Sequence, residues 1–88
     1  MIKLVSASLL HDKVLHLVFS DGSEGDLDIA AVLTRDTALT RPLAQPEYFS
    51  RFFLELGALC WPNGLEFSAG SLHEKLKQAG SLRHPATA

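Results

Sequence analysis

Three acidic residues at alternate positions are the first group whose types and spacing could do chemistry. Glu24, Asp26 and Asp28 are separated by Gly25 and Leu27. Alternate residues of a β-strand share one face, so a strand here would carry three carboxylates in a row. Such a row could bind Mg²⁺ or Ca²⁺, although neither a full ligand cage nor a phosphate partner is evident. The alternative is a solvated strand face that ends with Asp28 capping a short helix.

Cys60 is the second candidate, because a thiolate is a strong nucleophile. It is the one cysteine, so no internal disulfide is possible. Catalysis would need a nearby histidine or helix N-terminus to lower its pKa. His11, His16, His73 and His84 are scattered and do not match metal-ligand spacing. Because the cysteine lies in an apolar run, we expect a small buried hydrophobe. We therefore expect no catalytic residue, no cofactor and no metal site.

The stretch Trp61-Pro62-Asn63-Gly64 is the most distinctive in the chain. Pro62 fixes φ, and Asn63 and Gly64 accept left-handed conformations, so the stretch predicts a tight turn between two strands. Trp61 is then either a core or rim aromatic, or the anchor of a partner surface, where tryptophan is enriched. These four residues are the candidate interface.

The elements that must position these residues begin with a run of strands. Residues 2–9 and 14–19 are rich in apolar and β-branched side chains and predict two strands. Asp21-Gly22 between apolar runs is a strong hairpin signal. Residues 24–29 alternate with a period of two, and a short helix through residue 33 follows. The first half is therefore predicted to be a three-stranded antiparallel meander.

The middle of the chain predicts a short helix. Pro46 suits a first helical turn, and Glu47 there complements the positive end of the helix dipole. Phe49, Phe52 and Phe53 sit at helical spacing and should face the core.

The last third predicts a hairpin and a helix. Residues 54–61, with a break or bulge at Gly57, and residues 65–67 are the two strands of a C-terminal β-hairpin. Ser71 is expected to cap the last helix, with Glu74 completing a capping box. Gly80 is expected to end this helix.

Length and composition fit one small domain. The chain has 88 residues, 47% of them hydrophobic, and a net charge of −2. We expect a single domain over residues 1–80, followed by a flexible C-terminal tail at 81–88. Nucleic acid is an unlikely partner because phosphate binding needs an excess of Lys and Arg. No apolar stretch has the length of a membrane span or a signal peptide, so we expect a cytoplasmic protein without membrane contact.

The order of these motifs carries a family resemblance. An Asp-Gly hairpin, a Pro-Glu-Tyr-Phe helix at residues 46–49 and the Trp-Pro-Asn-Gly turn together resemble the bacterial domain-of-unknown-function 2442 family. The resemblance covers roughly residues 1–72, close to the whole domain. The family pattern has a proline after the returning strand, where this chain has Ser68-Ala69-Gly70.

The resemblance implies a fold and a partner-binding role, and it carries over no catalytic residue. Relatives are often encoded beside another small protein, in an arrangement similar to toxin–antitoxin pairs. Some relatives look as if they carry an added helix-turn-helix, for which this chain has no room.

The sequence thus predicts an α+β fold, in which a three-stranded antiparallel meander joins a C-terminal β-hairpin with two or three short helices on one side. The predicted function is a small non-enzymatic protein-interaction module, with an antitoxin-like partner of a two-gene system as its more specific form. A protein partner encoded nearby and a homodimer are both expected, since so small a core gains from association. One alternative is a nucleic-acid-associated transcriptional regulator. Another is a minor enzyme that uses Cys60 or the Glu24/Asp26/Asp28 stripe.

Overall fold

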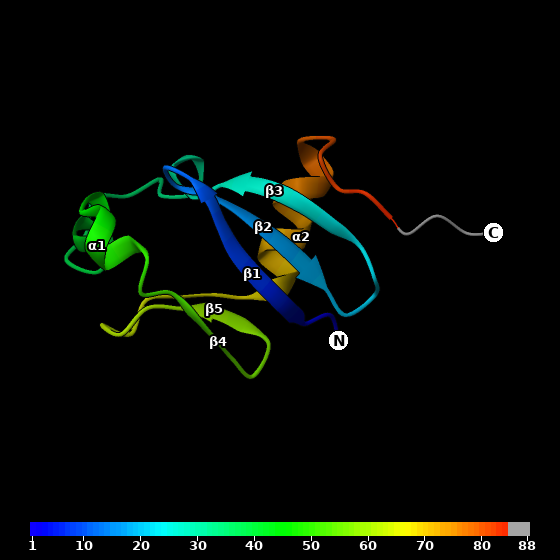
Figure 1. Cartoon of the computed structure of the whole chain (residues 1–88), viewed down its shortest axis with the longest axis horizontal. Helices are drawn as coiled ribbons and strands as arrows, with labels where there is room; N and C mark the ends of the chain where they lie inside the picture. Colours follow the sequence, from blue (N-terminus) through cyan, green and yellow to red (C-terminus); the bar gives the residue numbers. More distant parts are fainter. Residues whose placement is uncertain (85–88) are drawn as a thin grey trace.

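The first half of the chain is a three-stranded antiparallel sheet. The computed structural model describes residues 1–84 and has strands β1 (Leu4–His11), β2 (Val14–Phe19) and β3 (Glu24–Asp28) in the order β1-β2-β3. The predicted meander is therefore confirmed, and Figure 1 shows its strands in blue to cyan.

Local hydrogen bonds explain the turns of this sheet. Gly22 has a φ of 86°, which a glycine accepts at no steric cost. Across the same turn the Phe19 amide donates to the Ser23 carbonyl at 2.8 Å. At the other end of β3, the Asp28 carboxylate accepts from the Ala30 amide and caps the 3₁₀ helix η1 (Ile29–Ala31), as predicted.

The second half holds a second sheet of three strands, where the sequence had predicted a two-stranded hairpin. Strands β4 (Phe53–Glu55), β5 (Ala58–Cys60) and β6 (Glu66–Phe67) pair antiparallel in that order. The break or bulge expected at Gly57 is a full reversal of the chain at Leu56-Gly57, with φ values of 52° and 80°, so the predicted strand region 54–61 is divided between β4 and β5.

The helices are short, apart from the last one. The 3₁₀ helix η2 (Arg41–Ala44) and α1 (Pro46–Phe49) are followed by the strands of the second sheet. Because α1 ends after one turn, only Phe49 is buried; Phe52 is half-buried and Phe53 lies exposed at the start of β4. The prediction that all three aromatics face the core from one helix was therefore wrong.

Helix α2 (Ala69–Gln78) begins earlier than predicted. Its cap is Ser68, whose Oγ accepts a hydrogen bond from the Ser71 amide at 3.2 Å, so the capping role expected for Ser71 was wrong. The predicted capping box with Glu74 is absent for the same reason. Gly80 follows the helix at a φ of 72°, which confirms the predicted end.

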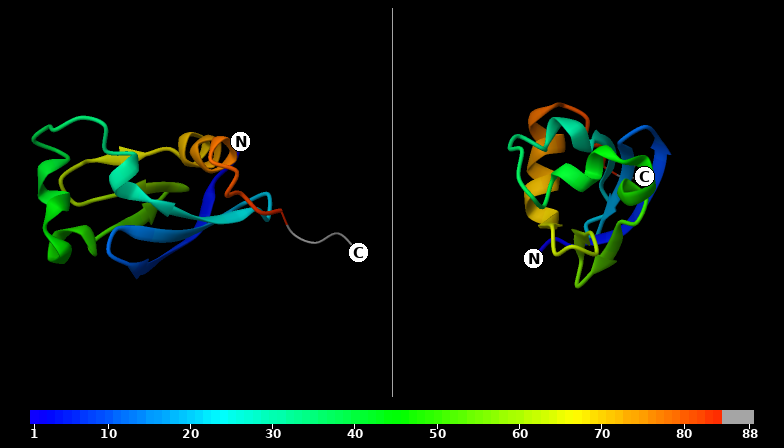
Figure 2. Two further views of the ribbon diagram at one scale, coloured as in Figure 1. Left: turned by 90° about the horizontal axis from the view of Figure 1, so that it is seen from above. Right: turned by 90° about the vertical axis from the view of Figure 1, so that its left-hand side faces the viewer.

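One hydrophobic core lies between sheet β1-β2-β3, helix α2 and the second sheet. Figures 1 and 2 show α2 against one face of the first sheet, with η2 and α1 at the far end of the molecule. The prediction that the short helices pack on one side is therefore wrong. The fully buried large side chains of this core are Trp61, Phe19, Phe49, Leu15, Leu17, Ile29, Leu43, Leu59, Leu72 and Leu76.

The chain after α2 returns to the first sheet. The backbone of Arg83 exchanges two hydrogen bonds of 2.8 Å with Glu24, and Leu82 packs against the core. Part of the predicted tail, residues 81–84, is thus attached to the edge of β3, while residues 85–88 lie outside the described residues. Within residues 1–84, no helix is both long enough and apolar enough to span a membrane.

Candidate interaction site at the free edge of strand β1

The acidic stripe on β3 is occupied by neighbouring side chains. The Nδ1 atom of His16 lies 2.6 Å from Asp26 Oδ1, and its Nε2 atom lies 3.7 Å from Glu24 Oε1. Arg83 Nη2 lies 3.4 Å from the same Glu24 oxygen, and Asp28 caps η1. Among residues 1–84, no three metal-ligating side chains are arranged to hold an ion. The stripe is a strand face whose carboxylates contact neighbouring groups of the same chain.

Cys60 lies in the core at the end of β5 and is 5% exposed. Its Sγ lies 3.8 Å from the Ala58 carbonyl and 4.0 Å from Glu66 Oε2, with no histidine among its hydrogen-bond contacts in the described chain. Burial raises the pKa of the thiol, and the carboxylates of Glu66 and Glu55 raise it further. A nucleophilic cysteine needs the opposite shift, so this environment favours a structural role.

The Trp-Pro-Asn-Gly stretch forms the predicted tight turn, and its tryptophan points inward. Trp61 is 1% exposed, and its indole N–H donates to the Phe49 carbonyl at 2.9 Å. Its ring packs against the rings of Phe49 and Phe67, at centroid distances of 5.7 and 6.0 Å. Of the four candidate interface residues, only Pro62, Asn63 and Gly64 are exposed. Trp61 is a core residue in this chain.

Asn63 ties this turn to the rest of the molecule. Its Oδ1 accepts from the Leu65 amide at 3.1 Å, and its Nδ2 donates to the Leu39 carbonyl at 2.9 Å. Its own amide donates to the Tyr48 hydroxyl at 2.9 Å. The turn therefore joins α1, the preceding loop and the second sheet, and its polar groups have partners within the chain.

A second polar cluster fixes the β2–β3 turn against α2. Asp21 Oδ1 accepts from the hydroxyl and the amide of Ser23, and these hydrogen bonds hold the pKa of the Asp21 carboxyl below its usual range. His73 of α2 packs edge-on against Phe19. Its Nε2 lies 3.3 Å from Asp21 Oδ2, without the geometry of a hydrogen bond, so this contact is electrostatic. Because the serine bonds the carboxylate and not the histidine, the cluster lacks the order of a catalytic triad.

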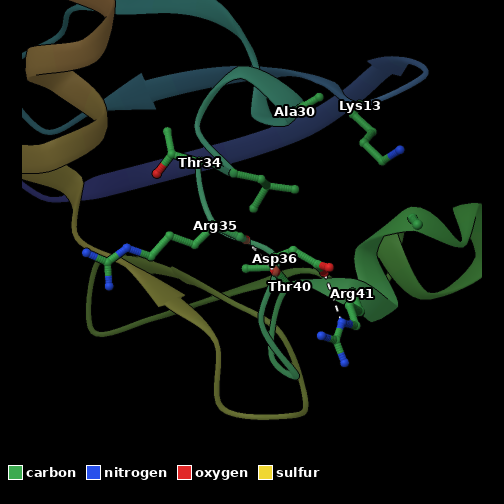
Figure 3. A pocket seen from close by; sticks show the side chains of 9 residues that line it. Lys13, Ala30, Thr34, Arg35, Asp36, Thr40 and Arg41 are labelled. Carbon is green, nitrogen blue, oxygen red and sulfur yellow. Dashed lines mark hydrogen bonds and ion pairs between the residues drawn. The ribbon is translucent and has the colours of Figure 1, made fainter.

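A surface hollow of about 470 Å³ lies between the β1–β2 turn, η1 and η2. Its basic side chains are Lys13, Arg35 and Arg41, and Arg41 Nε is paired with Asp36 at 2.9 Å. Figure 3 shows that the three cationic groups point in different directions. They do not converge on one position, which recognition of a small anion would require.

The outer edge of β1 differs from all of these, because beyond Leu4 its backbone groups have no hydrogen-bond partner among residues 1–84. The Phe19 amide of β2 donates away from β1, to Ser23. The N–H and C=O groups of successive strand residues point to opposite sides of the strand. Those of Leu17 and Leu15 therefore also point towards β3. Their partners across the other side of β2 are Ala7 and Leu9. The N–H and C=O groups of Ala7 and Leu9 therefore point to the free edge.

The side chains of this edge are uncharged, and several are apolar. From Leu4 to Leu10 the chain reads Leu-Val-Ser-Ala-Ser-Leu-Leu, and Val5, Leu9 and Leu10 are exposed. The register shifts at Leu4/Ser6 and at Leu9/His11, which leaves a regular segment over residues 6–9. The described backbone bonds this edge only at its beginning, where the Leu4 amide donates to the Gly57 carbonyl at 2.8 Å.

Sequence reasoning did not single out Ala7 and Leu9. Serine, alanine and leucine carry no motif, and which strand lies at the edge depends on pairing. The one signal available was the lack of any charged or proline residue over residues 4–10, because exposed edges are usually protected by such residues.

The fold defines the chain as a small α+β domain with two three-stranded antiparallel sheets. Residues 4–78 match the family described as "Protein of unknown function (DUF2442)", and the chain belongs to that family. The match confirms the resemblance and extends it to the end of α2. No curated protein and no solved structure matches the chain.

Proposed function

We propose that this chain is a non-enzymatic protein-interaction module that binds another polypeptide by adding a strand to the free edge of β1. The unpaired N–H and C=O groups of Ala7 and Leu9 on an uncharged strand carry this proposal. An added strand gains main-chain hydrogen bonds, and the exposed apolar side chains beside them gain burial. Each such bond contributes about 1 kcal/mol net, so a few of them support a reversible complex.

The more specific form of this function is an antitoxin-like role in a two-gene system. This form is proposed because relatives of this family are often encoded beside another small protein. The partner is then the protein encoded next to this chain, and its contribution to the complex is an extended segment. The edge of β1 supports this form because strand addition needs little sequence identity in the partner beyond an accessible strand.

Site-specific photo-crosslinking in cells that encode the protein tests the proposal. A photoreactive amino acid replaces Ser8, at the middle of the regular segment, and in a matched control it replaces the exposed Ser50. We expect adducts with a polypeptide from position 8 only, and we expect Ala7→Pro to abolish them. This proline removes an N–H that bonds nothing among residues 1–84.

Three results would overturn the proposal: no adduct from position 8, adducts that survive Ala7→Pro, or adducts formed equally from position 50. Recovery of nucleic acid in place of protein would favour the transcriptional regulator.

A further inference from the structure

The free edge of β1 has features that fit a particular occupant. Resting on the interaction role proposed above, we infer that a second copy of this chain pairs with it, in an antiparallel β1–β1 arrangement centred on Ser8. In cells, a strand from another protein would compete with this copy for the same edge.

The first argument is the alternation of backbone groups along β1. In a symmetric antiparallel pair, one residue lies opposite itself on the two-fold axis. With Ser8 on the axis, Ala7 of each copy lies opposite Leu9 of the other. These are the two residues whose N–H and C=O groups point to the free edge. Each Ala7–Leu9 pair can then exchange both of its hydrogen bonds.

The second argument is the side chains that this register brings together. Ala7 and Leu9 share the inner face of the sheet, since they pair with the buried Leu17 and Leu15 of β2. A small side chain therefore lies beside a large one across the axis. The two Ser8 side chains meet on the outer face, where their hydroxyls can bond each other.

The third argument is charge. Residues 4–10 carry no ionisable side chain, so pairing places no like charges opposite each other in this segment. The chain as a whole has a net charge of −2, and a pairing surface without charged side chains adds no further repulsion of its own.

The register is tested by one cysteine substitution and its matched control. Residues opposite each other in a pair that is not hydrogen-bonded lie about 4.5 Å apart at Cα, within the range of a disulfide. We expect Ser8→Cys to form a disulfide-linked dimer on mild oxidation. Ser6→Cys lies on the same face of the same strand, but its copies would be about 13 Å apart, so it should stay monomeric. Wild-type protein controls for the buried Cys60.

Sedimentation of the purified chain over a range of concentrations tests the association itself. We expect wild-type protein to approach twice the monomer mass as concentration rises, and Ala7→Pro to stay monomeric with an unchanged circular dichroism spectrum. Leu9→Lys should weaken the dimer at least tenfold, because it brings two charges to the edge. Leu39→Lys is its control, since Leu39 is 44% exposed and Leu9 42%.

Equal crosslinking of Ser6→Cys and Ser8→Cys would overturn the inference. So would a wild-type monomer at all concentrations, or a dimer unaffected by Ala7→Pro. A monomer whose β1 edge still crosslinks to another protein in cells would refute only the second copy. If the chain stays monomeric and its β1 edge also crosslinks to no other protein in cells, the proposed function is refuted as well.

Discussion

The Trp-Pro-Asn-Gly turn and the edge of β1 differ in where their polar groups find partners. In the turn, Trp61 and Asn63 bond to Phe49, Leu39 and Leu65 of the same chain. At the edge of β1, backbone donors and acceptors point outward with no partner among the described residues. The most recognisable stretch of the sequence is thus used to build the fold, and the unpaired strand edge carries no motif.

The largest expected effect separates the two regions by stability. Trp61→Ala leaves a cavity and removes the indole bond to Phe49, so it should lower the free energy of unfolding by about 3–5 kcal/mol. Urea denaturation followed by circular dichroism measures this loss. At a protein concentration where the chain is monomeric, Leu9→Lys, at the edge, should change it by less than about 0.5 kcal/mol. An equal loss of unfolding free energy in both variants would contradict the proposed difference between the two regions.

The second prediction concerns the polar links of the turn. Asn63→Ala removes the acceptor for Leu65 and the donor to Leu39, and should cost about 1–3 kcal/mol. Asn63→Asp keeps the acceptor for Leu65 but places a carboxylate oxygen against the Leu39 carbonyl, so it should also be destabilising at neutral pH and less so in acid, where the protonated carboxyl can donate. The same denaturation assay compares them. A harmless Asn63→Ala would show that the turn does not depend on these bonds.

The third prediction is a stabilising change at the tip of the β4–β5 hairpin. Leu56 is 93% exposed at a φ of 52°, a conformation that costs a leucine about 1 kcal/mol or more. Leu56→Asn should therefore raise the melting temperature. Leu10→Asn changes another exposed leucine without a positive φ and should give no such gain. A lower melting temperature for Leu56→Asn would mean that its side chain makes a stabilising contact.

The smallest expected effect is the pH dependence of the β2–β3 turn. The pKa of Asp21 is lower in the folded chain, because Ser23 bonds its ionised form. Its stabilisation is therefore present above the pKa of the unfolded chain and is lost as pH falls through the folded value. Asp21→Asn should flatten the decline of stability with acid below about pH 4. Thermal melts from pH 2 to 7 measure this slope, and an identical slope in both proteins would contradict the assignment.

The sequence predicted those parts of the fold that are determined by residues close together in the chain. The Asp-Gly turn, the cap at Asp28 and the end of α2 near Gly80 are set by residues close in sequence, and all three were predicted correctly. The turn at Leu56-Gly57 was predicted only as a break or bulge at Gly57, because a leucine rarely adopts the positive φ that a full reversal needs here. Its glycine is required by tertiary packing, since a Cβ there would lie 2.6 Å from that of Lys3.

The candidate site could be predicted only in part, for a related reason. The alternation of Glu24, Asp26 and Asp28 was visible in the sequence, but their pairing with His16 and Arg83 depends on the register of β2 and on the course of the chain after α2. Likewise, the residues at the edge of β1 become a candidate surface only when the order of the strands is known.

Amide hydrogen exchange of the purified protein at low and high concentration tests the central claim most directly. The amides of Ala7 and Leu9 should exchange fast in dilute solution and become protected as the chain associates. The amide of Gly64, which bonds to the Trp61 carbonyl, should exchange equally slowly at both concentrations. If Ala7 and Leu9 exchange at the same rate throughout, or protection develops at residues 62–64 instead, the edge of β1 is not the interaction site.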